Sequence, residues 1–194
     1  MLWLWLLSCT GEKSEVDSAT SVLEGCYGRT PSVEIGQGER EFEDFEEPYE
    51  SVMIHGPQGG WHILASLRTH GMMDIVEVHY TIEHLETSTF VSDNIYRLAV
   101  VSEGECSGYY PGLYGYLSVR DIYDGDLDTP PELLGGDTLR IRLRVTDCTT
   151  NMETLGLCVQ AERWAEASLN VTALLDPVDQ ISDSETDETI DTGS

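Results

Sequence analysis

The chain has few basic residues. Ten lysines and arginines stand against 36 aspartates and glutamates in 194 residues, and the formal net charge is −26 at pH 7. Lys13 is the single lysine. Proteins that bind nucleic acids gain most of their affinity from lysine and arginine side chains that neutralise phosphates. The composition therefore excludes nucleic acid as a direct partner, and it argues against electrostatic attachment to anionic lipid headgroups.

The chain also lacks the short motifs that identify common catalytic sites. Gly-x-Ser-x-Gly is absent, no glycine-rich phosphate loop occurs, and no serine or cysteine has an evident base beside it. No two cysteines have the Cys-x-x-Cys spacing of zinc or thiol-redox sites. Carboxylate pairs are abundant, but so acidic a chain contains them by chance. These absences favour a non-enzymatic protein.

No apolar run reaches the length of about 20 residues that a membrane-spanning helix needs. The chain instead begins with a short apolar stretch at residues 2–7, followed by Ser8 and Cys9. A small residue after an apolar stretch is typical of the end of a secretory signal. We therefore expect residues 1–8 to be a signal peptide. An ordinary buried amino-terminal strand is the alternative.

The segment Leu6-Leu7-Ser8-Cys9 resembles the lipobox of bacterial lipoproteins. In that family the cysteine is joined to diacylglycerol and its new amino group is acylated, so the resemblance implies a lipidated Cys9. Several acyl chains, at about 0.8 kcal/mol per buried methylene, hold a protein durably on a membrane. Thr10 after the cysteine resembles the outer-membrane lipoproteins of Gram-negative bacteria. The resemblance implies a protein of the cell envelope whose contact with the membrane is its lipid anchor.

Five cysteines occur, and setting the lipidated Cys9 aside leaves an even number, as export to an oxidising compartment predicts. Four cysteines allow three pairings. We favour Cys148 with Cys158, because the short loop between them is typical of a hairpin and its closure would restrict the unfolded chain by about 3 kcal/mol. Cys26 with Cys106 then follows by elimination. Four reduced, buried thiols are the alternative.

Composition divides the rest of the chain into three segments. Residues 9–25 are rich in Ser, Glu and Thr, which is typical of a flexible polar tether. Residues 176–194 contain seven carboxylates and no basic residue, which predicts a disordered acidic tail. Residues 26–175 are enough for one domain with its own core. The acidic excess either keeps the protein soluble or reflects a high-salt habitat.

Within residues 26–175, apolar and polar residues alternate with the period of two that is typical of β-strands. In residues 139–145 Leu, Ile, Leu and Val alternate with three arginines, so a strand would bury the first set and expose the second. Residues 76–83 and 165–173 show the same alternation. Further strands are expected at residues 61–68, 94–101 and 113–120, with Gly-, Pro- and Asp-rich turns between strands.

Seven or more short strands separated by turns predict an all-β domain, specifically an antiparallel β-sandwich of immunoglobulin-like architecture. Residues 136–147 resemble the late strands of secreted bacterial immunoglobulin-like domains. The buried Cys, Trp and Cys of antibody domains are not evident. A jelly roll or another sandwich is the alternative.

Residues 55–62 (His-Gly-Pro-Gln-Gly-Gly-Trp-His) are the most distinctive local string. The glycines and the proline predict a shaped hairpin turn whose Trp61 caps the core. The string also resembles segments of uncharacterised secreted bacterial lipoproteins, which implies no known activity.

Histidines around this turn suggest a metal site as a second interpretation. His55, His62 and His79 could bind copper or zinc, because imidazole suits both metals. If the apolar residues of 61–68 face the core, His62 points outward, and His79 points outward on its own strand, so neighbouring strands could share a metal. Further candidate ligands are His70, His84, Met53, Met72 and Met73. The spacings match no established metal site.

An acidic loop at residues 121–128 is a candidate calcium site. Asp124, Asp126 and Asp128 could supply oxygens, of which calcium needs six to eight. Their order departs from the calcium-loop pattern, so an acidic surface turn is the alternative.

Tyrosines alternate with glycines shortly before this loop, at Tyr109, Tyr110, Tyr114 and Tyr116. Tyrosine offers a flat apolar face and a hydroxyl, which suit contact with a glycan or an envelope protein, and core packing is the alternative. The sequence as a whole predicts a non-enzymatic, lipid-anchored cell-envelope protein that acts as a binding or structural module. A copper- or zinc-binding protein that uses His55 and His62 is the first alternative, and an envelope enzyme is the second.

Overall fold

The computed structural model describes residues 26–56, 59–122, 129–148 and 163–176. These residues include ten β-strands and a short helix, so the predicted all-β class is confirmed. The helix, α2, spans Pro130–Leu134. The strands are β1 (Ser32–Gln37), β2 (Glu43–Asp44), β3 (Glu50–His55), β4 (Trp61–His70), β5 (Ile75–His84), β6 (Thr89–Ala99), β7 (Val101–Gly104), β8 (Ser107–Leu117), β9 (Thr138–Asp147) and β10 (Trp164–Leu175).

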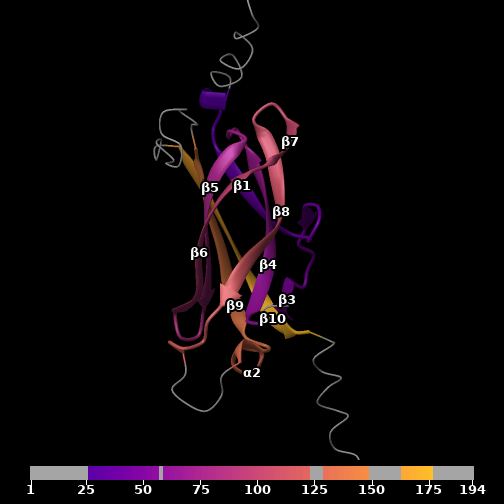
Figure 1. Cartoon of the computed structure of the whole chain (residues 1–194), viewed down its shortest axis with the longest axis vertical. Helices are drawn as coiled ribbons and strands as arrows, with labels where there is room; N and C mark the ends of the chain where they lie inside the picture. Colours follow the sequence, from indigo (N-terminus) through magenta and orange to yellow (C-terminus); the bar gives the residue numbers. More distant parts are fainter. Residues whose placement is uncertain (1–25, 57–58, 123–128, 149–162, 177–194) are drawn as a thin grey trace, which may run out of the picture.

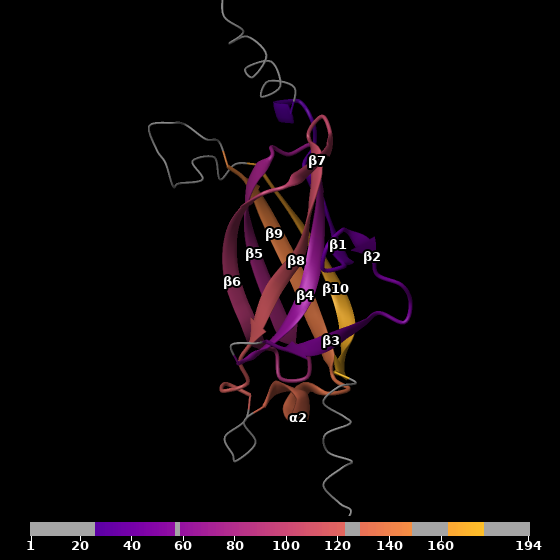
Figure 2. The same ribbon diagram turned by 45° about the vertical axis from the view of Figure 1, so that its right-hand side comes forward.

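The ten strands belong to one curled sheet (Figures 1 and 2). β8 pairs with one edge of β4. Along the other edge of β4, β3 pairs with residues 61–63 and β1 pairs with residues 66–70. From β3 the sheet continues through β10, β9 and β5 to β6. The curl brings β6 close to β8, where the Ser118 amide donates a hydrogen bond to the Val91 carbonyl at 2.7 Å. The sheet thus encloses its own core.

The predicted antiparallel sandwich of immunoglobulin type differs from this arrangement in two respects. β3 and β10 pair in parallel, with Thr172 opposite Glu50, so the sheet is mixed. The strands also form one continuous sheet, whereas a sandwich contains two. The physical reason is that a period of two shows which residues share a face, but it carries no information on which strands pair.

The core lies on the inner side of the curled sheet. Alternate residues of a strand point to opposite faces, so the apolar residues of β9 face inward and its three arginines face outward, as predicted. The largest fully buried side chains come from five strands (β3, β4, β5, β8 and β9), from α2 and from the turn between β4 and β5. They include Met53, Ile63, Leu67, Tyr80, Ile82, Leu113, Leu139, Ile141 and Leu143.

One end of the sheet is cross-linked by a disulfide. Cys26 and Cys106 are bonded, with their Cα atoms 5.4 Å apart, which confirms the predicted pair. Cys148 is also disulfide-bonded. Its predicted partner, Cys158, lies outside the described residues, so that pair stays a prediction.

Candidate functional site

The turn between β3 and β4 is the hairpin that its glycines predict. The Gly56 amide donates to the Gly60 carbonyl at 2.9 Å, and the two strands pair antiparallel with His55 opposite Trp61. The rings of His55 and Trp61 have centroids 4.8 Å apart. Trp61 packs against the core, as predicted. His62 follows on the opposite face of β4.

His62 is only 5% exposed although it lies on the outer face of the sheet. Tyrosines of β8 cover it, because His62 is opposite Tyr116 in the β4–β8 pair. The centroid of the imidazole ring lies 4.8 Å from that of Tyr114 and 6.3 Å from that of Tyr116. Burial, with the charge of His55 as a second cause, lowers the pKa of His62 from 6.5. The neutral imidazole is therefore favoured in the folded protein.

Together His62, Tyr114 and Tyr116 form an aromatic surface that we call the aromatic platform. The two tyrosine rings have centroids 5.9 Å apart and planes within 16° of each other, and the residues are 41% and 56% exposed. Gly115 lies between them on the inner face, where a Cβ atom would lie 2.6 Å from the buried Ile82 side chain. The alternation of β8 therefore places both tyrosines outward, in contact with solvent.

His79 does not lie beside the other two predicted metal ligands. It belongs to β5, which pairs with β6 and β9, so β4 and β5 are consecutive in the chain without being neighbours in the sheet. The Nε2 atom of His79 lies 2.7 Å from Oδ1 of Asp93. A copper or zinc site at His55 and His62 stays a prediction.

The remaining sequence candidates fall into two groups. Met53 and Met72 are buried in the core, and His70 lies 3.2 Å from the Glu34 carboxylate. The predicted calcium ligands, the predicted lipidation site and the predicted signal peptide lie outside the described residues. They are Asp124, Asp126, Asp128, Cys9 and residues 1–8.

A group of three possible metal ligands, which the sequence did not predict as a cluster, lies at the end of β5. His84, Glu86 and Asp137 each place one ligand atom within 4.8 Å of the others. The Nε2 atom of His84 is 3.1 Å from Oδ2 of Asp137, and its Nδ1 atom is 2.9 Å from Oγ1 of Thr87. Among the described residues, this is the one such group of three or more His, Cys, Asp or Glu side chains.

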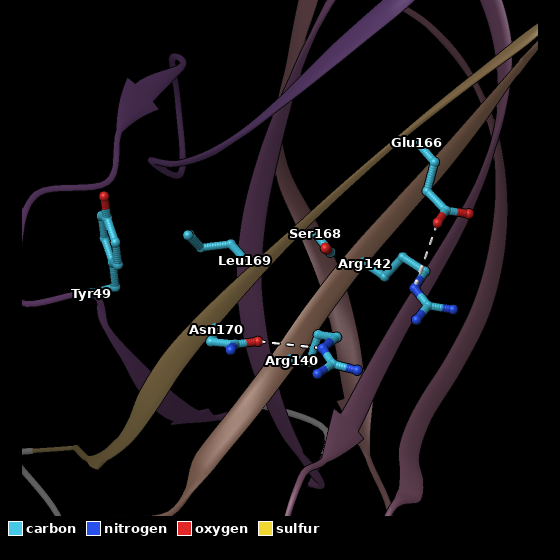
Figure 3. Close-up of a pocket in the computed structure, with 7 residues that line it drawn as sticks. All are labelled: Tyr49, Arg140, Arg142, Glu166, Ser168, Leu169 and Asn170. Carbon is cyan, nitrogen blue, oxygen red and sulfur yellow. Dashed lines mark hydrogen bonds and ion pairs between the residues drawn. The ribbon is translucent and has the colours of Figure 1, made fainter.

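A surface groove of about 530 Å³ lies on the outer face of β9 and β10 (Figure 3). Its arginines already have carboxylate partners: Arg140 is 3.1 Å from Glu83, and Arg142 is 3.8 Å from Glu166. Arg140 also donates to Asn170 at 3.4 Å. The groove therefore presents locally balanced charges. Its lining residues are Tyr49, Arg140, Arg142, Glu166, Ser168, Leu169 and Asn170.

Comparisons with known proteins complete the description of the chain. No protein-family model matches it. No curated protein and no solved structure matches it either. In the described part of the chain, helices long and apolar enough to span a bilayer are absent.

Proposed function

We propose that the protein is a non-enzymatic, lipid-anchored module of the bacterial cell envelope that binds a glycan on the aromatic platform. The observation that carries this proposal is the pair of nearly parallel, exposed rings of Tyr114 and Tyr116. Parallel rings offer flat apolar faces on which sugar rings can stack, and the phenolic hydroxyls can exchange hydrogen bonds with sugar hydroxyls. Both features suit a polymer of sugars.

The platform is held rigidly before any ligand binds. β8 pairs with β4 from Trp61 to His70, and the buried His62 lies against both tyrosine rings. The hydroxyl of Tyr96 in β6 donates to the carbonyl of Tyr114, which ties a third strand to this surface. Rigid aromatic side chains lose little conformational entropy on binding. The geometry therefore favours recognition by a preformed surface.

The net charge of the chain indicates which class of glycan it would bind. A chain of net charge −26 repels anionic polymers over distances comparable with the Debye length, about 8 Å at physiological ionic strength. Acidic polysaccharides would approach against this repulsion, whereas uncharged sugars would not. We therefore propose a neutral glycan as the ligand.

Binding to neutral oligosaccharides tests the platform. The full-length chain is titrated with chitin and β-glucan oligosaccharides while heat release is recorded. The double variant Tyr114→Ala/Tyr116→Ala should lose at least about tenfold in affinity, since central aromatic contacts dominate binding energies. Tyr49→Ala, which removes a tyrosine from the Arg140 and Arg142 groove, is the matched control and should bind as the wild type does. Equal binding by the double variant and the control would refute the platform, as would a wild type that binds none of the sugars.

Membrane anchoring rests on Leu6-Leu7-Ser8-Cys9, which resembles the lipobox. A lipidated Cys9 at the start of a 17-residue tether, residues 9–25, would let the domain lie at most about 60 Å from the bilayer. Metabolic labelling with a fatty-acid probe tests this part separately. The wild type should incorporate the label and Cys9→Ala should not, and a Cys9→Ala chain that still takes up label would contradict lipidation at this residue.

A further inference from the structure

We propose that His84, Glu86 and Asp137 form a binding site for a divalent first-row metal ion, with zinc as the expected occupant. The inference does not depend on the glycan proposal, because the group involves none of the platform residues. The three residues lie near the end of the sheet at which α2 is found, and β7 lies at the opposite end in both views (Figures 1 and 2).

The backbone brings the ligands together without a metal. His84 is the last residue of β5, and the amide of the next residue, Leu85, donates to the Thr138 carbonyl at 3.2 Å. Asp137 immediately precedes β9, and its carbonyl accepts a hydrogen bond from the Ala173 amide at 2.9 Å. Two of the three ligands therefore lie at the paired ends of neighbouring strands. Sites built on such rigid elements are preorganised.

The donor atoms match zinc in kind and in spacing. Zinc sites with an open position use three protein ligands from His, Asp and Glu, with water as the fourth ligand. Two ligand atoms at about 2.0–2.1 Å from a tetrahedral zinc lie about 3.3 Å apart. The Nε2 atom of His84 and the Oδ2 atom of Asp137 are 3.1 Å apart, so little movement is needed for both to bind one ion. Glu86 is exposed, and its flexible side chain can complete the site.

Thr87 allows the imidazole to act as a metal ligand. Metal binding through Nε2 requires the ring proton to be on Nδ1. The Nδ1 atom of His84 lies 2.9 Å from the Thr87 hydroxyl, which can either donate or accept a hydrogen bond. In the tautomer whose Nε2–H donates to Asp137, the hydroxyl donates to Nδ1. With metal, Nδ1–H donates to the hydroxyl, the arrangement by which outer partners orient histidine ligands in metal sites.

The same donor set distinguishes zinc from the hard cations. Calcium takes six to eight oxygen ligands, and magnesium keeps most of its water, so neither gains much from one imidazole and two carboxylates. Imidazole favours zinc, copper and nickel. Excess magnesium should therefore saturate weak binding to the many other carboxylates of this chain and leave the proposed site to zinc.

Zinc titration of the metal-free, full-length chain in excess Mg²⁺ tests the proposal. We expect one tightly bound zinc ion and a higher Tm in its presence. Glu86→Gln and Asp137→Asn should weaken zinc binding by more than the roughly 10- to 100-fold that loss of an outer partner costs. His79→Gln is the matched control: it removes another histidine of β5 that contacts an aspartate, at 2.7 Å, and zinc binding should not change.

Glu86→Gln is the decisive variant, because Glu86 is exposed and its loss should leave the fold intact, whereas His84 is buried. Circular dichroism confirms folding of each variant. Zinc affinity in Glu86→Gln and Asp137→Asn equal to that of the wild type would overturn the proposal. So would the absence of zinc binding in excess Mg²⁺, or zinc binding that is lost in His55→Ala/His62→Ala and retained in Glu86→Gln.

Discussion

Gly115 lies where β8 passes closest to the core. A Cβ atom there would lie 2.6 Å from Cδ1 of Ile82 and 2.8 Å from the ring of Tyr80. Tyr80 is fully buried, and its hydroxyl donates to the Ile63 carbonyl at 3.2 Å, so the ring cannot move away without losing this bond. We expect Gly115→Ala to lower the free energy of unfolding by about 1–3 kcal/mol, measured by urea denaturation.

Gly28→Ala is the matched control for this substitution. No atom lies within 4 Å of the Cβ position at Gly28, so its effect should stay within about 0.5 kcal/mol. If both variants unfolded at the same urea concentration, the close packing of β8 on the core would be contradicted.

His62 couples the stability of the fold to pH. Burial first, and the charge of His55 second, lower its pKa from 6.5, so between the lowered pKa and 6.5 the unfolded chain binds more protons than the folded one. The contribution of His62 to stability is therefore complete above pH 6.5 and is lost as the pH falls through the lowered pKa. The difference in unfolding free energy between pH 8 and pH 5 should be smaller in His62→Gln than in the wild type.

His55→Gln tests the second cause of this shift. Removing the neighbouring imidazole should raise the pKa of His62 while leaving it below 6.5, because desolvation by burial remains. Titration of the His62 ring by NMR in the wild type and in His55→Gln measures both values. A His62 pKa at or above 6.5 in the wild type would show that the tyrosines do not cover the ring in solution.

At the scale of elements, a buried ion pair joins β9 and β10 to the turn between β4 and β5. Asp147 is fully buried and lies 3.3 Å from Nε of Arg163, and its other oxygen accepts a hydrogen bond from the Met73 amide at 2.9 Å. Arg163 also donates to the carbonyls of Gly71 and Arg29. Burial raises the pKa of Asp147, against the opposing effects of Met73 and Arg163. One ion pair thus connects segments far apart in the sequence.

Asp147→Asn should leave the guanidinium of Arg163 without its charged partner. Breaking a buried pair from one side costs about 3–5 kcal/mol, so we expect a loss of this size in urea denaturation. Glu105→Gln breaks an exposed ion pair between Glu105, whose side chain is 82% exposed, and Arg29, whose side chain is 51% exposed. This substitution should lower the free energy of unfolding by at most about 1 kcal/mol. Equal losses in the two variants would mean that water reaches the Asp147 pair.

Four of the long strands were predictable because their alternation is clear over many residues, whereas the predicted ranges 94–101 and 113–120 cover only the later parts of β6 and β8 and extend beyond their ends. At least ten residues form each of the strands β4, β5, β9 and β10, and the residue range predicted for each strand lies within its observed bounds. β1 has only two alternating apolar residues, Val33 and Ile35, and the apolar residues of β3, at positions 52–54, are consecutive, so neither strand shows a clear period of two. Local sequence therefore identifies the strands that form most of the core and misses those that complete the sheet.

The candidate sites were predictable only in part, for a related reason. The tyrosines of β8 were recognised by their alternation, but their face depends on the inward position of Gly115, which only the packed structure shows. His84 and Asp137 are 53 residues apart in the sequence, so no short motif contains them. Pairing of β5 with β9 brings them together, and pairing is what periodicity cannot predict.

At the scale of the whole molecule, the charges of the two signs are unequally distributed. All nine arginines lie among the described residues, where most form ion pairs, as Arg97 does with Glu77 at 3.2 Å. Residues 176–194, by contrast, contain seven carboxylates and no basic residue. The positive charges are thus used within the fold, and most of the negative charge has no cation to offset it.

Salt should therefore stabilise this protein. Screening weakens both the attraction within exposed ion pairs and the repulsion among the excess carboxylates, and the Debye length falls from about 10 Å at 0.1 M to about 3 Å at 1 M salt. Exposed pairs contribute only about 0–1 kcal/mol each, whereas 36 acidic residues face ten basic ones, so relief of repulsion should be the larger effect. We expect the Tm to rise between low and molar NaCl. A Tm that stays constant or falls would show that the ion pairs of the outer face matter more than the net charge, and it would remove the argument for adaptation to high salt.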